Sequence, residues 1–145
     1  MNHYGKSSQT VFNELHKDLQ LVFKTVLRVM DNSLLVGFRD EDNQDKAFDS
    51  GNSKVQWPDS YHNEFPSMAV DATPYPKPLN WGEDNRDEYE KFRYFAFYVL
   101  GVADVLYALG AIDHQLEWGG DWDNDKDVTD NSFNDLLHFQ LRRKK

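Results

Sequence analysis

The sequence predicts an α+β fold in which two long helices pack on a small sheet. Over two long stretches, apolar residues recur at steps of three and four, which is the period of an amphipathic helix. Short apolar runs lie between and after these stretches, at 33–39, 68–70, 116–118 and 134–141. The chain has 145 residues, of which 39% are hydrophobic and 14% aromatic, and this suits one domain with a single core.

The first long helix is predicted within residues 1–32. From Val11 to Met30 the apolar side chains follow helical spacing, and the pattern ends near residues 31–32. His16 falls on the polar side and is interpreted as a surface residue. The helix is interpreted as a scaffold that packs against the core.

A short strand is predicted from Ser33 to Arg39, followed by an acidic segment with a short helix near 44–48. Two interpretations fit Arg39. It is either a surface arginine at a strand edge, or a guanidinium that stabilises the oxyanion of a tetrahedral intermediate. Three prolines within 74–78 exclude both a helix and a central strand, so this segment is a stiff connector or one wall of a groove.

The second long helix is predicted from Arg86 to Leu109. Its apolar positions form a wide face, which indicates that much of the helix is buried. Gly110 follows directly and suits the C-terminal cap, where the backbone often adopts a left-handed conformation. A strand at 116–118 and a turn at Gly119-Gly120 come next.

Two histidines and two carboxylates lie in or beside the short apolar runs. Asp71 closes the run 68–70, and a carboxylate buried there requires a lysine, an arginine or a metal ion as its partner. His62 precedes this run and His138 lies in the last one; imidazole and carboxylate are both ordinary zinc ligands. His62, Asp71 and His138 are therefore the predicted zinc ligands, with the fourth position left for water. Asp135, three residues before His138, is the predicted general base that takes the proton of that water.

Four fragments occur in an order that resembles a known family of zinc peptidases. The fragments are Ser60-x-His62, Ala69-Val70-Asp71, Trp118-Gly119-Gly120-Asp121-Trp122 and Asp135-x-x-His138-Phe139. Together they are similar to the D-Ala-D-Ala carboxypeptidase (VanY-like) and L-alanyl-D-glutamate endopeptidase family, and most of all to its single-domain phage endolysins. Gly37-Phe38-Arg39 resembles the Gly-x-Arg of the same family, and the likeness runs from about Leu35 to Leu141.

The resemblance implies a Hedgehog/DD-peptidase-like fold, which is α+β with a small, mainly antiparallel sheet and two long helices. Residues 1–145 are then a single zinc peptidase catalytic domain, with the N-terminal helix of 1–32 packed on it and a basic tail at 142–145. The implied activity is hydrolysis of the peptidoglycan stem peptide at the L-Ala-D-Glu bond by a phage endolysin. In this activity Asp135 is the base and Arg39 steadies the oxyanion.

The chain departs from the common family pattern at three places. Eight residues separate His62 from Asp71, which is more than the usual spacing and is interpreted as a longer loop. Many relatives have proline before the last histidine and glutamate two residues after it, whereas this chain has Leu137 and Gln140. Asp130 is a further carboxylate close in sequence to the predicted base.

The segment after the glycine turn alternates carboxylates at Asp121, Asp123, Asp125 and Asp127. Oxygen ligands at every second position are typical of the start of a calcium loop. The match is partial, since the loop has no glycine at its sixth position and no glutamate at its twelfth. Two interpretations remain: a solvated acidic loop, or a Ca²⁺ site that orders the loop beside the zinc.

The charge balance narrows the expected partners. The net charge is −9, so we expect no nucleic-acid partner, because phosphate binding depends on basic surface. The basic tail is either a solvated end of the chain or a weak electrostatic contact with an anionic cell envelope. The chain has no cysteine, so zinc must use histidine and carboxylate ligands. Peptidoglycan is the expected partner, and we expect a monomer.

No apolar run approaches the length of a membrane span, and the first residues lack the apolar core of a secretory signal. We therefore expect synthesis in the host cytoplasm and action on the cell wall after release. Two other functions stay open. One is a D-Ala-D-Ala carboxypeptidase, for which Arg39 and Lys54 are the cations that could meet a terminal carboxylate. The other is a non-catalytic metal-binding domain on the same fold.

Overall fold

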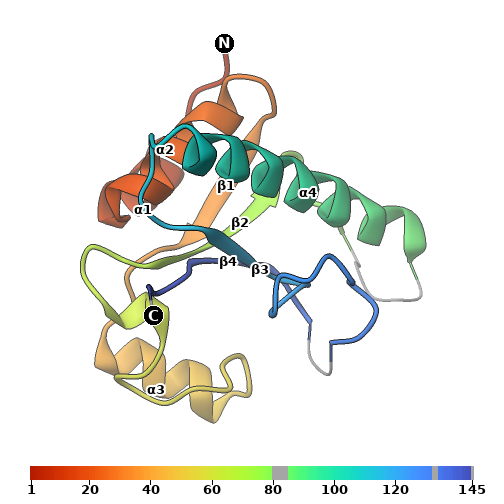
Figure 1. The fold of residues 1–145 in the computed structure, drawn as a ribbon. Helices are drawn as coiled ribbons and strands as arrows, with labels where there is room; N and C mark the ends of the chain where they lie inside the picture. Colours follow the sequence, from red (N-terminus) through yellow and green to blue (C-terminus); the bar gives the residue numbers. More distant parts are fainter. Residues whose placement is uncertain (80–84, 132–133, 145) are drawn as a thin grey trace.

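The computed structural model describes residues 1–79, 85–131 and 134–144 (Figure 1). Its fold class is α+β, as predicted, with helices packed on a small antiparallel sheet. In chain order the elements are α1 (Lys6–Glu14), α2 (Lys17–Leu27), β1 (Asn32–Val36), α3 (Glu41–Asp49), the 3₁₀ helix η1 (Tyr61–Asn63), β2 (Ala69–Pro74), α4 (Arg86–Ala108), β3 (Leu116–Gly119) and β4 (Asp135–Leu141).

The four strands lie in the order β1-β2-β4-β3, and each neighbouring pair is antiparallel. In the β2–β4 pair, Val70 lies opposite Phe139 and Asp71 lies opposite His138. Successive side chains along a strand point to opposite faces of the sheet. The apolar pair therefore projects to one face and the polar pair to the other.

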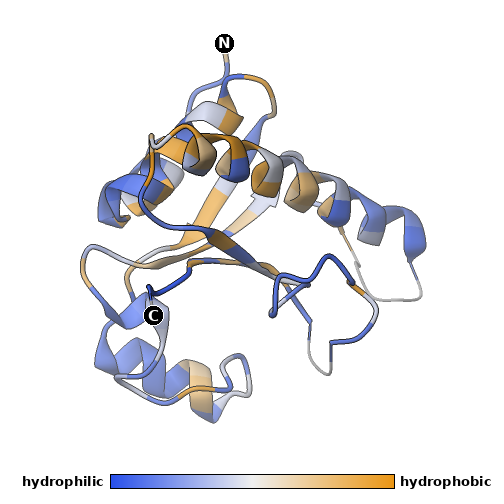
Figure 2. Ribbon diagram, in the orientation of Figure 1, coloured by the Kyte–Doolittle hydropathy of each residue, from blue (hydrophilic) through white to orange (hydrophobic). Residues whose placement is uncertain are grey.

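Helices α1, α2 and α4 cover the apolar face of the sheet, while α3 lies on the other side (Figure 1). Apolar residues of these helices and of the strands, coloured orange in Figure 2, form the hydrophobic core. Phe139 of β4 meets Phe23 of α2 and Phe95 of α4 edge to face, with ring centroids 5.6 and 6.0 Å apart. With its core on one side, the sheet leaves the other face for polar chemistry.

The N-terminal helix is two helices, so the prediction of one continuous helix was wrong. The backbone of Leu15 is extended and forms a parallel bridge with Ser67. His16 N donates to the Ser67 carbonyl at 2.9 Å, and Ser67 N donates to the Glu14 carbonyl at 2.8 Å. These bonds to a segment some fifty residues away replace the helical ones. His16 then caps α2, because its Nδ1 accepts from Asp18 N at 3.0 Å.

The bounds of the second long helix agree with the prediction, but the helix is less buried than expected, because Leu100, Val102 and Leu106 are only half-buried and Tyr107 is exposed. Helix α4 buries one face, formed by Phe92, Phe95, Ala96, Val99 and Ala103. It ends at Ala108, and Gly110 has the left-handed φ of +73° expected after a helix. The predicted short helix near 44–48 is longer, since α3 begins after Asp40, whose carboxylate accepts from Asn43 N.

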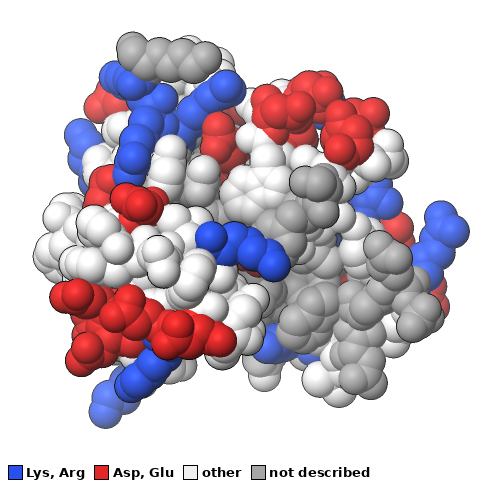
Figure 3. Space-filling model, turned by 90° about the horizontal axis from the view of Figure 1, so that it is seen from below, with Lys and Arg blue, Asp and Glu red and all other residues white. Residues whose placement is uncertain are grey.

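The basic end of the chain is attached to the domain as far as Arg143. Arg142 forms an ion pair with Glu117, and Arg143 with Glu64. The guanidinium of Arg143 also lies over the ring of Tyr61, 4.2 Å from its centroid. Lys145 lies outside the described residues. On the face shown in Figure 3, acidic side chains form separate groups with basic side chains between them.

Within the described ranges, no helix combines the length and apolarity needed to cross a bilayer.

Candidate metal centre

The polar face of the sheet brings two of the predicted ligands together. Asp71 and His138 are cross-strand partners in the β2–β4 ladder, so their side chains rise from the same face. His138 Nδ1 lies 3.4 Å from Asp71 Oδ1. Both residues are part of a regular antiparallel ladder, and the backbone therefore fixes their relative position.

The third predicted ligand comes from the short helix η1. Ser60 begins this helix with a capping box, in which its Oγ accepts from His62 N and the Asn63 side chain accepts from Ser60 N. His62 is buried, and its Nδ1 donates to the Gly37 carbonyl at 2.7 Å. A carbonyl only accepts, so Nδ1 carries the proton and Nε2 presents its lone pair toward the sheet.

The three predicted ligands form a nearly equilateral triangle of donor atoms. His62 Nε2 lies 3.3 Å from Asp71 Oδ1 and 3.3 Å from His138 Nδ1, and the third side is the 3.4 Å between Asp71 and His138. Ligands placed tetrahedrally around zinc at its usual bond lengths lie about 3.3–3.4 Å from one another. The spacing of the three atoms is therefore that of three zinc ligands.

The hydrogen bonding of Asp71 also fits a cation at this position. Asp71 Oδ1 is buried and has no hydrogen-bond partner within the protein. A buried carboxylate oxygen without a partner is costly, and a cation in the triangle would satisfy it. Two imidazoles and one carboxylate, with one side open to a pocket, are a donor set that suits a catalytic zinc ion.

The charges of the centre influence each other strongly. Burial raises the pKa of the Asp71 carboxyl, but the interactions with His138 and His62 lower it by more, so it stays ionised. Burial lowers the pKa of His138, and the interaction with Asp71 outweighs it and raises the pKa. For Asp135, burial and the charge of Asp71 both raise the pKa.

A pocket of about 340 Å³ opens beside this triangle. Asp135 and Arg39 line it together with the three predicted ligands. Arg39 Nη1 donates to Gln44 Oε1 at 3.1 Å, and Arg39 Nη2 lies 4.0 Å from Asp71 Oδ2. Asp130, the other carboxylate considered as base, is exposed and does not line the pocket.

The acidic loop lies next to the pocket through Trp122. This side chain lines the pocket, and its ring centroid lies 5.5 Å from that of His138. Carboxylate oxygens of Asp121, Asp123 and Asp125 lie within 4.8 Å of one another, and the buried Asp121 Oδ1 has no hydrogen-bond partner. Asp127 is not in this group, and its carboxylate accepts from the backbone and hydroxyl of Thr129 instead.

Gln44 is a supporting residue that the sequence did not reveal. It is completely buried, and its Oε1 accepts from Arg39 and from Asn63. Its Nε2 donates to Ser53 Oγ and the Val55 carbonyl, which belong to the pocket wall. A glutamine on the acidic helix α3 looks like a surface residue, so no sequence signal marked this role.

A second group of two histidines and an aspartate lies at the start of α2. His16, Asp18 and His114 have ligand-type atoms within 4.8 Å of one another. Here the carboxylate is already satisfied, because Asp18 Oδ2 accepts from Asp113 N, His114 N and His114 Nδ1. His16 Nδ1 is occupied as the helix cap. The group is a hydrogen-bonded link between α2 and the segment before β3, and the interpretation of His16 as a surface residue was incomplete.

The structure is similar to the solved structure of an endopeptidase. The crystal structure of the L-Ala D-Glu endopeptidase ChiX of Serratia marcescens matches with a TM-score of 0.65 and 24% sequence identity. The match covers 96% of this chain and 89% of that chain. At this identity the similarity establishes a shared fold. No family model and no curated protein matches the chain.

Proposed function

We propose that the protein is a zinc-dependent peptidoglycan hydrolase that cleaves the stem peptide at the L-Ala-D-Glu bond. The observation that carries the proposal is the donor triangle of His62, Asp71 and His138, which opens into a pocket lined by Asp135 and Arg39. The shared fold with an L-Ala D-Glu endopeptidase supports the choice of substrate.

In the proposed mechanism, His62, Asp71 and His138 would hold the zinc ion, which would supply Lewis-acid polarisation of the attacking water and the scissile carbonyl. Asp135 takes the proton of the water and later passes it to the leaving amine. Burial and the charge of Asp71 raise the pKa of Asp135, which makes it a stronger base than a solvated aspartate. Arg39, held by Gln44, donates to the oxyanion that forms on the carbonyl.

Digestion of purified peptidoglycan by the wild type and by Asp135→Ala tests this function, with mass spectrometry of the products and zinc content measured on both. We expect new N-terminal D-Glu from the wild type only, with zinc kept in both proteins. Release of free D-Ala would instead identify a D-Ala-D-Ala carboxypeptidase, for which Lys54 and Arg39 in the pocket wall could meet the terminal carboxylate. If the zinc-loaded wild type gives no product, the remaining interpretation is a non-catalytic metal-binding domain.

We also propose that the acidic loop binds Ca²⁺ through Asp121, Asp123 and Asp125. The unpartnered Asp121 Oδ1 supports this, because a solvated loop gives no reason to bury a carboxylate oxygen without a donor. Calcium titration of the zinc-loaded protein, followed by tryptophan fluorescence, is the test. We expect a saturable change that Asp121→Asn abolishes, and an unchanged signal in the wild type would contradict the site.

The biological setting is proposed from the resemblance to phage enzymes. The protein is then an endolysin that acts as a monomer, is made in the host cytoplasm and reaches the wall after release. Expression in bacteria with and without permeabilisation of the inner membrane tests this setting. We expect lysis only after permeabilisation, and lysis that never occurs would argue against it.

A further inference from the structure

The two histidines of the candidate metal centre are oriented in different ways. His62 donates from Nδ1 to a backbone carbonyl, that of Gly37, which cannot change into a donor. His138 contacts a side-chain amide instead, with its Nε2 2.8 Å from Gln140 Oε1. An amide can turn over and present either its oxygen or its NH₂ group. The tautomer of His138 therefore depends on what fixes Gln140.

Glu117 on the neighbouring strand fixes the amide. Glu117 and Gln140 lie directly opposite each other in the β3–β4 ladder, and Gln140 Nε2 donates to Glu117 Oε2 at 2.9 Å. An ionised carboxylate only accepts hydrogen bonds. The NH₂ group of Gln140 must then face Glu117, and its oxygen must face His138.

This orientation determines which nitrogen of His138 is free. Because Gln140 Oε1 only accepts, His138 Nε2 must carry a proton, and in the neutral ring Nδ1 then has none. Nδ1 is the atom that lies 3.4 Å from Asp71 Oδ1 and 3.3 Å from His62 Nε2. Its lone pair thus points into the donor triangle. If the amide of Gln140 were reversed, its NH₂ group would face His138 Nε2, and the proton of the neutral ring would lie on Nδ1 instead.

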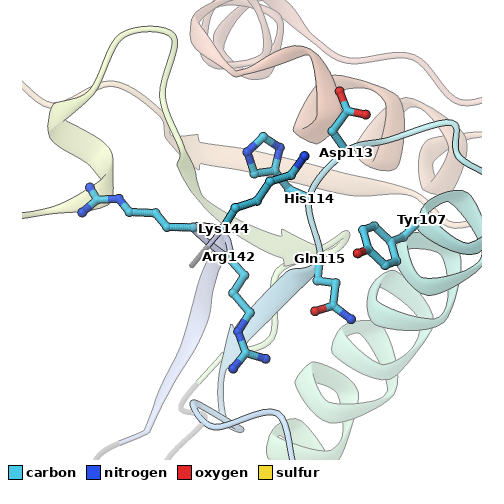
Figure 4. Close-up of a pocket in the computed structure, with 7 residues that line it drawn as sticks. Tyr107, Asp113, His114, Gln115, Arg142 and Lys144 are labelled. Atoms are coloured by element: carbon cyan, nitrogen blue, oxygen red, sulfur yellow. The ribbon is translucent and has the colours of Figure 1, made fainter.

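Glu117 is itself held in place by the end of the chain. Its Oε1 lies 3.3 Å from Arg142 Nε, and its side chain is only 12% exposed. The backbone N of Arg142 donates to the Gln115 carbonyl at 2.8 Å, so the arginine lies beside β3. Figure 4 shows its side chain extending from the end of β4 across β3, away from His114 and Lys144. Each oxygen of Glu117 therefore has one donor.

We propose that Glu117, acting through Gln140, selects the His138 tautomer that can bind zinc. Glu117 and Gln140 are positioning residues. The Glu117 carboxylate does not contact His138 itself but acts on it through the amide of Gln140. The inference rests on the proposed role of His138 as a zinc ligand. Partners of this kind typically change metal affinity by about 10- to 100-fold.

Two readouts test the inference without measuring hydrolysis. Nitrogen-15 NMR of the metal-free protein, at a pH where the imidazoles are neutral, reports the tautomer of each histidine. Competition with a chromophoric chelator reports the zinc dissociation constant. In Glu117→Gln, which has the same shape but an amide that can turn over, we expect a mixed tautomer at His138 and about 10-fold weaker zinc binding. His62 is the internal control and should keep its tautomer.

A matched control and a rescue separate this role from a general structural one. Glu64→Gln removes the neighbouring carboxylate–arginine pair, with Arg143, and should change neither readout. The double variant Glu117→Gln/Gln140→Glu exchanges the two groups, so that a carboxylate accepts directly from His138 Nε2–H. We expect it to restore both the tautomer and the zinc affinity.

An unchanged His138 tautomer and unchanged zinc affinity in Glu117→Gln would overturn the inference, and so would a double variant that fails to recover either. Should Glu117→Gln fold poorly, Gln140→Leu removes the same hydrogen bonds, and it too must weaken zinc binding. The proposed function fails separately, if the wild type takes up no zinc or cleaves no peptidoglycan whatever the tautomer of His138 is.

Discussion

Asp71 shows how much a single residue can reveal. A carboxylate that closes an apolar run needs a lysine, an arginine or a metal ion as its partner, and the nearby His62 favoured a metal ion. The structure places His62, His138 and Arg39 around it. The sequence could not supply all the hydrogen bonds that orient these groups, because Gln44 and Glu117 reach the site only through tertiary contacts.

Arg39 provides a prediction at the residue scale. Its guanidinium lines the pocket and is held by Gln44, so under the proposed function Arg39→Met removes the donor that would meet the oxyanion. We expect kcat on stem peptide to fall about 100- to 1,000-fold, with zinc content close to that of the wild type. Steady-state kinetics together with metal analysis check this, and a variant with full kcat would assign Arg39 only a structural role.

At the scale of elements, the sequence predicted the features that depend on residues close together in the chain. Helix α4 ends at Ala108, shortly before Gly110, as expected, because the apolar periodicity and the capping glycine agree. The N-terminal helix breaks at Leu15 because the chain there pairs with Ser67, and no local pattern contains a partner so far away. The alternation of side chains between the two faces of β2 and β4 also follows from local sequence, but the register that pairs these strands does not.

The link between α2 and the segment before β3 gives a prediction about stability. Burial raises the pKa of Asp18, but hydrogen bonds from His114 and Asp113 N lower it by more, so the net pKa is below its ordinary value. Asp18→Asn should cost about 1–3 kcal/mol, because hydrogen bonds to an ionised carboxylate are stronger than those to a neutral amide oxygen.

The sign of the pH dependence follows from the lowered pKa. The carboxylate contributes stability above its unfolded-state pKa of about 3.9, and this is lost as the pH falls through the lower folded-state pKa. The stability difference between wild type and Asp18→Asn should therefore shrink below about pH 4. Urea unfolding at several pH values measures it, and a difference that grows in acid would contradict the assignment.

Asp135 lies opposite Gly119 in the β3–β4 ladder, and Gly119 makes this close approach possible. A Cβ on Gly119 would lie 2.2 Å from the Asp135 carbonyl oxygen, which is a backbone atom. Gly119→Ala should therefore displace Asp135 and lower both stability and peptidoglycan cleavage. Gly101→Ala is the matched control, since nothing lies within 4 Å of its Cβ, and in the interior of α4 it should stabilise by about 0.5–1 kcal/mol. Thermal unfolding and activity of both variants are the measurements.

At the scale of the whole molecule, one face of the sheet packs against the hydrophobic core and the other carries the candidate metal centre. The helices α1, α2 and α4 take the apolar face, and the opposite face carries Asp71, His138, Gln140 and Glu117 at regular positions of its ladders. The fold class followed from periodicity, and the predicted ligand set from the residues of the apolar runs and the order of the motifs. The network that orients the ligands required the strand order β1-β2-β4-β3, which no single stretch of sequence contains.

The measurement that tests the central claim most directly is removal and restoration of zinc. The wild type is stripped with a chelator and dialysed, and peptidoglycan cleavage is followed as zinc is added back in known amounts. We predict no cleavage by the stripped protein, and recovery that is complete at one zinc per chain. In Asp71→Asn, where the unpartnered carboxylate oxygen is replaced, the same addition should restore little activity. Full cleavage by the stripped wild type would contradict the account, because the triangle would then have no part in the reaction.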